Sequence, residues 1–516
     1  MIPFKAPLDD ILFCLRHVAG ADSIPDWDED LAEGILEHFA SFAEGVLAPI
    51  DEVGDAQGCT LADGRVAMPE GFKEAYAQLA EGGWQGLTAP EDFGGMGQNA
   101  LLAAGVSEIF SGANHAMQMV CNLVPGAIST LLKFGTDKQK QDWIPRLAAG
   151  LTLSTMCLTE PGAGSDLSRI RTKATPSGES WRIEGEKIFI SGGDQDMSED
   201  MLHLVLARTS GEGVKGLSLF LCPSHQDGAR NAVTVTRIEE KLGLHASPTC
   251  QLAFEGAEAE LIGEEGAGLM AMFTMMNHAR LDVSLQGVAH AARAAHIAKE
   301  YATERKQGRK ADGSEAVLAD HPDVQRMLDE QKALALGARA MTYLTMAELT
   351  LGQSRALVDF LTPICKVFCT EAGIRAADLG IQVLGGYGYL TEYRVSQTWR
   401  DARITSIYEG ANGIHAVAIA TRGLRAPDGP DAFVSLIETL ADGNADCLAL
   451  LADWQAARAT MSESAIEKSY DFMALSAEVL YRAVWCKLAS SGEAEIVRLS
   501  KRVERRPLPV RLPLTA

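Results

Sequence analysis

Apolar positions in the first 150 residues recur three and four apart, with short breaks at Gly and Pro. This spacing is typical of amphipathic helices. One helix start is especially clear, because the Thr136 side chain can accept from a backbone N–H while Gln139 reaches back to Thr136, a capping box that opens the helix carrying Trp143 and Leu147. We therefore predict a helical region over residues 1–150.

The pattern changes at residue 151 to short apolar and β-branched runs separated by Gly, Ser, Pro and Asp. Such runs predict strands, and their spacing suits a compact antiparallel barrel or sandwich over 151–264. The predicted strands are 151–158, 181–191, 201–209, 216–222, 231–238 and 249–255.

Long helical patterns return after Gly266, and Leu281, Leu285 and Val288 lie on one apolar stripe. A stripe of this kind packs inside a helix bundle, which we predict over 265–425. A Pro/Gly linker at 426–431 then precedes amphipathic stretches at about 431–458 and 463–490, so residues 426–516 are interpreted as an additional helical segment. The predicted fold class is α+β. A solvated basic tail is expected from about 491, with Arg498, Lys501, Arg502, Arg505, Arg506 and Arg511.

Composition excludes several classes of protein. The 46 basic and 69 acidic side chains give a net charge of −23, which argues against binding nucleic acid over a broad surface. The ten cysteines include no C-x-x-C pair and are read as reduced thiols; Cys365 and Cys369 lie one helical turn apart without a nearby His, so no metal is predicted. The sequence shows neither a signal peptide nor an apolar run of about 18 residues. We therefore expect a cytoplasmic protein without a membrane span.

The segment 157–166 has the composition of a ligand-binding loop. Gly162 and Gly164 give the backbone freedom, and Thr159 and Ser165 supply hydroxyls. The third glycine of a dinucleotide fingerprint is missing, and the chain has no P-loop, zinc-protease or hydrolase-elbow motif. The loop could approach a flat polar ligand, or it could be an ordinary Pro-Gly turn.

Glu409 is the candidate acid–base residue. It precedes Gly410, and Asn412 can cap a helix that runs to about Gly423, so the carboxylate lies just upstream of a positive helix end. One interpretation is a solvated acid favoured by the helix dipole. The neighbouring side chains of Ile407 and Tyr408 favour a second interpretation, in which the carboxylate is desolvated, its pKa rises and it abstracts a proton.

Several separated motifs together resemble those of the acyl-CoA dehydrogenase family, over about residues 60–425. They are APEDFGGMG at 89–97, LTEPGAGSD at 158–166, GEKIFISGG at 185–193, KLG at 241–243, NHAR at 277–280, ERK at 304–306 and the Glu409 segment. The resemblance implies an N-terminal helical domain, a middle β-domain and a C-terminal four-helix bundle. It also implies FAD as cofactor, held between the domains and across the interface of a homodimer or tetramer.

The resemblance assigns site residues one by one. Phe189 stands where many relatives have Trp, Ser191 stands where Thr is usual, and Arg305 matches the arginine that reaches the FAD pyrophosphate of the partner subunit. Glu409 would take the α-proton of an acyl-CoA thioester while the β-hydride passes to flavin N5. Implied substrate contacts are Ser165, Asn277, Arg280, Tyr408 and Gly410. Implied FAD contacts are Met156, Leu158, Thr159, Gly164, Ser165, Phe189, Ile190, Ser191, Arg305, Gln382, Gly385, Gly386, Ala411 and Gly413.

Length and some departures from the smaller members, such as Ala411 and Gly413, resemble the larger acyl-CoA dehydrogenases with an extra C-terminal helical domain. That group includes 3-(methylthio)propionyl-CoA dehydrogenases and broad-range long-chain enzymes. The expected activity is therefore FAD-dependent α,β-dehydrogenation of an acyl-CoA to the trans-2-enoyl-CoA, with an electron-transfer flavoprotein as acceptor. The alternatives are a medium- or long-chain enzyme of β-oxidation, an acyl-CoA oxidase, and a catalytically inert acyl-CoA- or flavin-binding relative.

Overall fold

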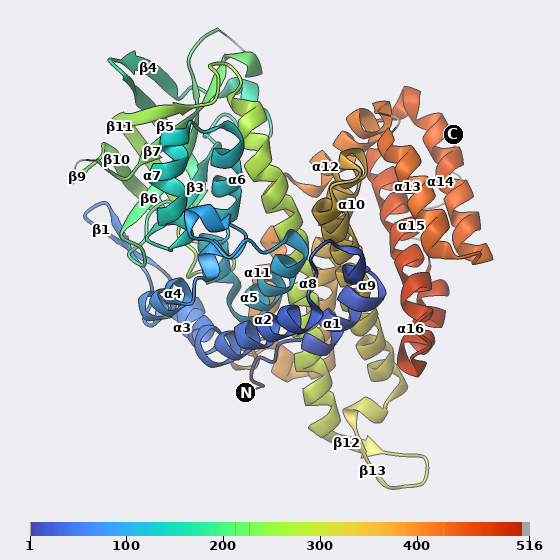
Figure 1. Ribbon diagram of the computed structural model, residues 1–516. Helices are drawn as coiled ribbons and strands as arrows, with labels where there is room; N and C mark the ends of the chain where they lie inside the picture. The colour runs from blue at the N-terminus through green and yellow to red at the C-terminus, as the bar shows by residue number, and fades with distance from the viewer. Residues whose placement is uncertain (1, 212, 227, 427, 508–516) are drawn as a thin grey trace. The chain divides into compact units, whose positions relative to one another are not determined.

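The computed structural model describes residues 2–211, 213–226, 228–426 and 428–507 (Figure 1). The chain forms two compact units. Unit 1 contains Met1–Glu44, Ala100–Ala113 and Arg280–Ala516, and unit 2 contains Gly45–Asn99 and Asn114–Ala279. Two helices, α5 (Ala100–Cys121) and α8 (Gly268–Glu304), pass from one unit to the other, and α5 is interrupted by non-helical backbone at Asn114.

A seven-stranded sheet organises unit 2, with its strands in the order β10-β11-β5-β4-β6-β3 and β7 paired with both β11 and β6. All six predicted strands are confirmed, and β4 is additional. The core beside this sheet contains the buried side chains of Cys157, Val205, Phe220, Leu252 and Phe254. The strands are β3 (Thr152–Cys157), β4 (Lys173–Ser177), β5 (Ser180–Ser191), β6 (Asp200–Arg208), β7 (Leu217–Pro223), β10 (Val233–Ile238) and β11 (Thr249–Ile262).

The sheet differs from the antiparallel prediction at one edge. β3 and β6 run parallel, in register from Thr152 opposite Asp200 to Cys157 opposite Val205, and β4 meets β6 in the parallel sense at one residue pair. Parallel neighbours need a long connection, which the segment 158–199 provides. The remaining pairings in this sheet are antiparallel.

The helices of unit 2 include α3 (Ala48–Gln57), α4 (Phe72–Glu81), α6 (Val124–Phe134) and α7 (Asp137–Ala148). The capping box of α7 is confirmed, because the Gln139 N–H donates to Thr136 Oγ1 at 3.2 Å and the Thr136 N–H donates to Gln139 Oε1 at 3.1 Å. Gln139 Nε2 also donates to the Leu261 carbonyl at 3.0 Å, which joins α7 to β11.

The region predicted to be helical also contains a hairpin, β1 (Thr60–Ala62) and β2 (Arg65–Ala67). Its turn is Asp63-Gly64, and both residues have positive φ. Asp-Gly is a preferred pair for two-residue hairpin turns.

Unit 1 is helical around α9 (Pro322–Leu351) and α10 (Arg355–Leu384), which pack along each other. The fully buried Arg339 on α9 donates to Glu108 on α5 at 2.6 and 3.0 Å, and the Tyr343 hydroxyl donates to Glu108 at 2.8 Å. These bonds pair a buried charge and join two distant parts of the sequence. Unit 1 also contains α1 (Leu8–His17), α2 (Glu29–Phe42), the hairpin β12 (Lys306–Arg309)/β13 (Glu315–Val317), α11 (Val395–Ala402) and α12 (Asn412–Ala418).

The C-terminal segment forms α13 (Asp428–Ala441), α14 (Ala445–Ser464), α15 (Ser469–Ala489) and α16 (Ala494–Glu504). The predicted linker at 426–431 is wrong, because α13 begins at Asp428 and includes Gly429 and Pro430; proline in the first helical turn costs no hydrogen bond. The stretch at 431–458 is likewise two helices rather than one. They are separated at Asp442-Gly443, where both residues have positive φ.

The expectation of a solvated basic tail is wrong for the residues up to Glu504. They form α16, whose apolar side Ile496, Leu499 and Val503 is buried. Arg498 is anchored to Asp329 of α9 through bonds of 2.6 and 2.9 Å. The amphipathic pattern of this segment therefore decides its structure, despite its many basic side chains. Arg511 lies outside the described residues.

Within the described parts of the chain, none of the helices combines the length and the hydropathy needed to cross a membrane.

Candidate active site

Glu409 lies in a tight turn between the short helix Arg403–Ser406 and α12 in unit 1. It has φ of 54°, and Gly410 follows with φ of 96°. A Cβ at residue 410 would lie 2.8 Å from His415 Nε2, so both the conformation and the space require glycine. A non-glycine residue held in left-handed backbone is strained, and such strain is found where surrounding groups fix the geometry of a functional side chain.

Donors from three helices hold this turn. The Glu409 carbonyl accepts from Arg280 Nε of α8 at 3.4 Å and from His415 Nε2 of α12 at 3.1 Å. The fully buried Lys366 of α10 donates to the Gly410 carbonyl at 2.8 Å and to Asn412 Oδ1 at 2.9 Å. The backbone that follows the Glu409 side chain is therefore fixed by hydrogen bonds at two successive carbonyls.

The predicted helix cap at Asn412 is wrong. The N-cap of α12 is Ala411, which has no side-chain capping bond, and Asn412 is the first helical residue. Its side chain is instead engaged by α10, where it accepts from Lys366 and donates to Glu371 Oε1 at 3.2 Å. The buried ammonium group of Lys366 needs hydrogen-bond acceptors, and it binds the Asn412 side-chain amide that would otherwise be free to cap the helix.

The charges around Glu409 set its proton affinity. Burial raises the pKa of the Glu409 carboxyl to about 7, although Arg280 and Lys366 oppose the rise. Burial lowers the pKa of Lys366 to about 7 and that of His415 to about 3, so His415 is neutral with its proton on Nε2. A raised pKa agrees with the interpretation of Glu409 as a desolvated carboxylate; its role as a base stays a prediction.

Tyr408 connects the turn to α8. Its hydroxyl donates to Gln286, and Gln286 Nε2 donates to Asp282 at 3.0 Å. Burial raises the pKa of Tyr408 well above its usual range, so the phenol remains neutral. Arg280, Tyr408, Glu409 and Gly410, which are all predicted to act in catalysis or substrate binding, therefore meet in one cluster.

A second group of predicted residues meets in unit 2, where β3 ends beside β5. The Ile188 N–H donates to the Thr159 carbonyl at 2.9 Å, which joins the loop after β3 to the end of β5. Phe189 is 60% exposed and has φ of 57°. Ser165 is also exposed, and a Cβ at Gly164 would meet no atom within 4 Å. Met156, Leu158, Thr159, Gly164, Ser165, Phe189, Ile190 and Ser191 all belong to this region.

A buried ion pair supports this loop. Lys187 Nζ donates to the Leu158 carbonyl at 2.9 Å, to the Leu206 carbonyl at 2.8 Å and to Glu160 Oε1 at 2.9 Å. Glu160 in turn accepts from the N–H groups of Arg171 at 2.7 Å and Thr172 at 3.0 Å. The loop and the adjoining end of β5 thus present an exposed aromatic ring, hydroxyls and open backbone on a rigid base, which fits a flat polar ring system such as a flavin.

A third group lies at the far end of α10. The Arg305 guanidinium lies 5.5 Å from the centre of the Tyr387 ring, next to Gly385 and Gly386, where a Cβ would meet no atom within 4 Å. Gln382 lies 16 residues beyond Lys366 on α10, which corresponds to roughly 24 Å of helix. The Arg305 group is therefore well separated from Glu409 within one chain. Ala411 and Gly413 stay beside Glu409 at the start of α12, and Asn277 belongs to unit 2.

Family models match three successive parts of the chain. The acyl-CoA dehydrogenase N-terminal domain matches residues 30–151, the middle domain 155–257 and the C-terminal domain 266–424. The chain belongs to the acyl-CoA dehydrogenase family. It is an oxidoreductase that acts on acyl-CoA, and the predicted succession of helical, β and helical regions is confirmed.

Individual acyl-CoA dehydrogenases are similar to most of this chain. The 3-methylmercaptopropionyl-CoA dehydrogenase of Ruegeria pomeroyi is 41% identical, covering 80% of this chain and 75% of the relative. The broad-specificity linear acyl-CoA dehydrogenase FadE5 of Mycobacterium tuberculosis is 35% identical, covering 81% and 74%. The crystal structure of Caenorhabditis elegans ACDH-11 in complex with C11-CoA has a TM-score of 0.84 at 19% identity and covers 99% and 93%. The shared fold thus includes the C-terminal helices.

Sequence reasoning about this acyl-CoA dehydrogenase missed the groups that hold the Glu409 turn. Lys366 interrupts an otherwise apolar run, DFLTPICKVFC, and a single lysine in such a run signals a buried charge that needs partners. His415 was visible in the motif but had no assigned role. Glu371 gave no sequence signal, because its partners are distant along the chain.

Proposed function

We propose that Glu409 is the catalytic base of this acyl-CoA dehydrogenase, and that it removes the α-proton of the acyl-CoA while a hydride leaves the β-carbon. The observation that carries the proposal is the raised pKa of Glu409, to about 7, in a turn fixed by Arg280, Lys366 and His415. A base with a pKa near neutrality is half deprotonated at working pH and is matched to proton abstraction. The Glu409 N–H would donate to the enolate-like oxygen, an oxyanion-hole role.

We propose FAD as the cofactor, and bound FAD would supply the acceptor for the β-hydride. The exposed Phe189 ring, the hydroxyls of Thr159 and Ser165 and the open backbone at Gly164 would hold the ring system. Arg305 and the segment 382–386 would bind the pyrophosphate and adenosine of FAD in a partner subunit. The roughly 24 Å of α10 between Gln382 and Lys366 supports this homodimeric arrangement, since one chain's Arg305 group is far from its own Glu409.

For the substrate, we propose 3-(methylthio)propionyl-CoA, supported by the identity of 41% to the Ruegeria pomeroyi enzyme of that name. A medium- or long-chain acyl-CoA is the alternative, supported by the similarity to the broad-specificity enzyme. An electron-transfer flavoprotein is the proposed acceptor of the electrons, and the cytoplasm is the proposed compartment. Asn277 and Arg280 are proposed contacts to the CoA portion of the substrate. The division into 1–150, 151–264, 265–425 and 426–516 remains a prediction.

The base assignment is tested by Glu409→Gln under anaerobic conditions. The variant should remain yellow with bound FAD but should not lose flavin absorbance when acyl-CoA is added. Glu348→Gln is the matched control, because burial also raises the pKa of Glu348, which is not a predicted site residue. Full bleaching of Glu409→Gln would remove Glu409 from the role.

Two further measurements separate the alternatives. Anaerobic titration with a panel of acyl-CoAs should show preference for 3-(methylthio)propionyl-CoA over thioesters of similar reach without sulfur; equal bleaching by long chains would support the broad-range reading. Reoxidation of the reduced enzyme by air should be slow. Rapid reoxidation with stoichiometric peroxide would identify an oxidase.

A further inference from the structure

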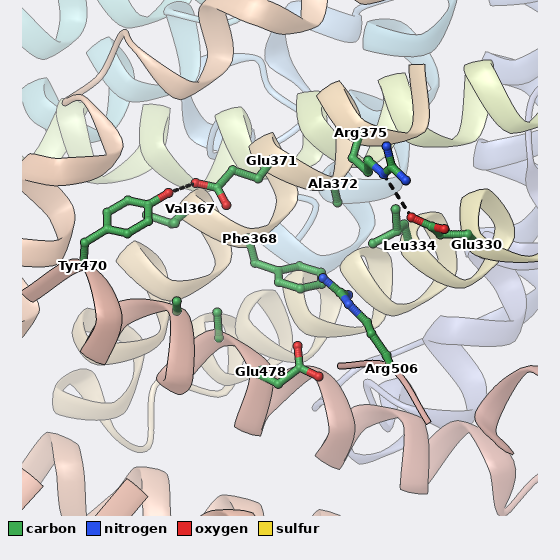
Figure 2. Close-up of a pocket in the computed structure, with 12 residues that line it drawn as sticks. Glu330, Leu334, Val367, Phe368, Glu371, Ala372, Arg375, Tyr470, Glu478 and Arg506 are labelled. Atoms are coloured by element: carbon green, nitrogen blue, oxygen red, sulfur yellow. Dashed lines mark hydrogen bonds and ion pairs between the residues drawn. The ribbon is translucent and has the colours of Figure 1, made fainter. Parts of the chain in front are cut away.

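The C-terminal helical segment has a polar connection to the catalytic turn. Tyr470 lies in the first turn of α15, and its hydroxyl donates to Glu371 of α10 (Figure 2). Glu371 Oε1 also accepts from Asn412 Nδ2 at 3.2 Å, and Asn412 Oδ1 accepts from Lys366 at 2.9 Å. The path ends at Lys366 Nζ, which donates to the Gly410 carbonyl at 2.8 Å.

Each bond in this path restrains the next group. Asn412 can present its carbonyl oxygen to Lys366 only while its NH₂ group points the other way, toward Glu371 and Thr370 Oγ1 at 3.3 Å. Glu371 is exposed, so its rotamer is fixed by partners rather than by packing. The Tyr470 hydroxyl is one of those partners, and it comes from a helix outside the four-helix bundle.

The surroundings of Tyr470 make this contact accessible to experiment. A cavity of about 260 Å³ lies between α9, α10 and α15. Figure 2 shows the Tyr470 ring reaching Glu371 on one side of the lining residues, Phe368 and Arg506 near the middle, and Glu330 and Arg375 on the other side. Tyr470 is 48% exposed. Removing its hydroxyl therefore leaves no buried void, unlike most core substitutions.

We propose that Tyr470, Glu371, Asn412 and Lys366 form a positioning relay through which the C-terminal helical segment fixes the Glu409 turn, so that this segment contributes to the rate of dehydrogenation. The proposal rests on Glu409 as the base. Lys366 is a positioning residue, because it contacts the backbone after Glu409, and Tyr470 acts through it.

The charged and titratable groups that act on the turn and on its partners come from several elements. Arg280 and Asp282 lie on α8, Lys366 and Glu371 on α10, Asp401 on α11, His415 on α12, and Arg422 in the helical turn Ile419–Gly423. Removing the Lys366 ammonium takes away a positive charge that favours the Glu409 carboxylate. The pKa of Glu409 should then rise further.

The first test uses Lys366→Met, Lys366→Arg and Tyr470→Phe in the FAD-bound enzyme. Lys366→Met should lower the rate of flavin reduction at saturating acyl-CoA about tenfold and move the acid limb of the pH profile up by about one unit. Lys366→Arg should restore part of the rate. Tyr470→Phe should lower the same rate several-fold while KM for acyl-CoA stays unchanged.

Tyr481→Phe is the matched control. Tyr481 lies on the same helix, and its hydroxyl donates to the Ala333 carbonyl of α9 at 3.0 Å, outside the relay. This variant tests whether any loosening of α15 lowers the rate. An equal rate loss in Tyr481→Phe and Tyr470→Phe would overturn the relay.

A double-mutant cycle tests the connection itself. In a relay, Lys366→Met/Tyr470→Phe should lose little more rate than Lys366→Met alone, because the single substitution has already broken the path. Independent, multiplying losses would contradict the proposal. If Lys366→Met does not fold, Glu371→Gln combined with Tyr470→Phe replaces that arm of the cycle.

Hydrogen exchange separates this proposal from the proposed function. Tyr470→Phe should speed exchange in peptides covering 407–415, and Tyr481→Phe should not. If Glu409→Gln bleaches fully with acyl-CoA but this exchange pattern is found, the base assignment fails while the connection from Tyr470 to the turn stands. If the enzyme bleaches and exchange at 407–415 is unchanged in Tyr470→Phe, the relay fails.

Discussion

The proton affinity of Glu409 makes a direct prediction about the pH dependence of the reaction. A base works deprotonated, and burial raises the pKa of Glu409 to about 7. The rate of flavin reduction should therefore rise with pH through about 7 and fall about tenfold per unit well below it. Stopped-flow reduction between pH 5.5 and 8.5 measures this limb. Because Lys366 titrates in the same range, the observed value belongs to the pair.

Gly410 provides a second prediction for single residues. Gly410→Ala would place a methyl group 2.8 Å from His415 Nε2 at a φ of 96°. The substitution should destabilise the protein by about 1–3 kcal/mol and reduce flavin bleaching. Thermal unfolding measures the first effect. The control for stability is Gly413→Ala, because a Cβ at Gly413 would meet no atom within 4 Å and the residue lies in α12. An equal loss of stability in the two variants would show that the turn is not strained.

Among the elements, the loop after β3 depends on the Lys187–Glu160 pair. Lys187→Met leaves a buried carboxylate without its partner, which typically costs about 3–5 kcal/mol. FAD should bind more weakly, since Leu158 and Thr159 lose their support. Thermal unfolding and titration with FAD measure both effects, and Lys173→Met, at an exposed position of β4, is the control.

The double substitution Lys187→Met/Glu160→Gln sharpens the same prediction. It removes both charges, so it should be more stable than Lys187→Met alone. A double variant that is less stable than the single one would show that the lysine contributes by packing rather than by pairing.

The elements also show what local patterns could predict. The six strands and the α7 capping box were predictable because each depends on neighbouring residues. The parallel β3–β6 pairing was not, because it depends on how the chain returns after the segment 158–199. The Glu409 segment was found from its motif, whereas Lys366 and Glu371 act through partners more than 40 residues away, which no local spacing indicates.

At the scale of the whole molecule, buried histidines should make the two units respond differently to acid. In unit 2, burial lowers the pKa of His203 to about 4, and this ring is neutral against Thr155 and Phe254. The unfolded chain protonates it near 6.5, so the stability it contributes is present above about pH 6.5 and is lost as pH falls toward 4. The slope is about 1.4 kcal/mol per pH unit.

Unit 1 has compensating groups in the same window. As pH falls, the lowered pKa values of His415 and His296 make unit 1 less stable, whereas the raised pKa values of Glu409 and Glu348 make it more stable. For Glu409 this gain falls between about pH 7 and 4.5. Unit 2 should therefore open first in acid. Hydrogen exchange at pH 7 and 5, corrected for the intrinsic pH dependence of exchange, should show loss of protection in β3, β6 and β11 before α9 and α10. His203→Gln should remove that difference, and earlier opening of unit 1 would contradict the assignment.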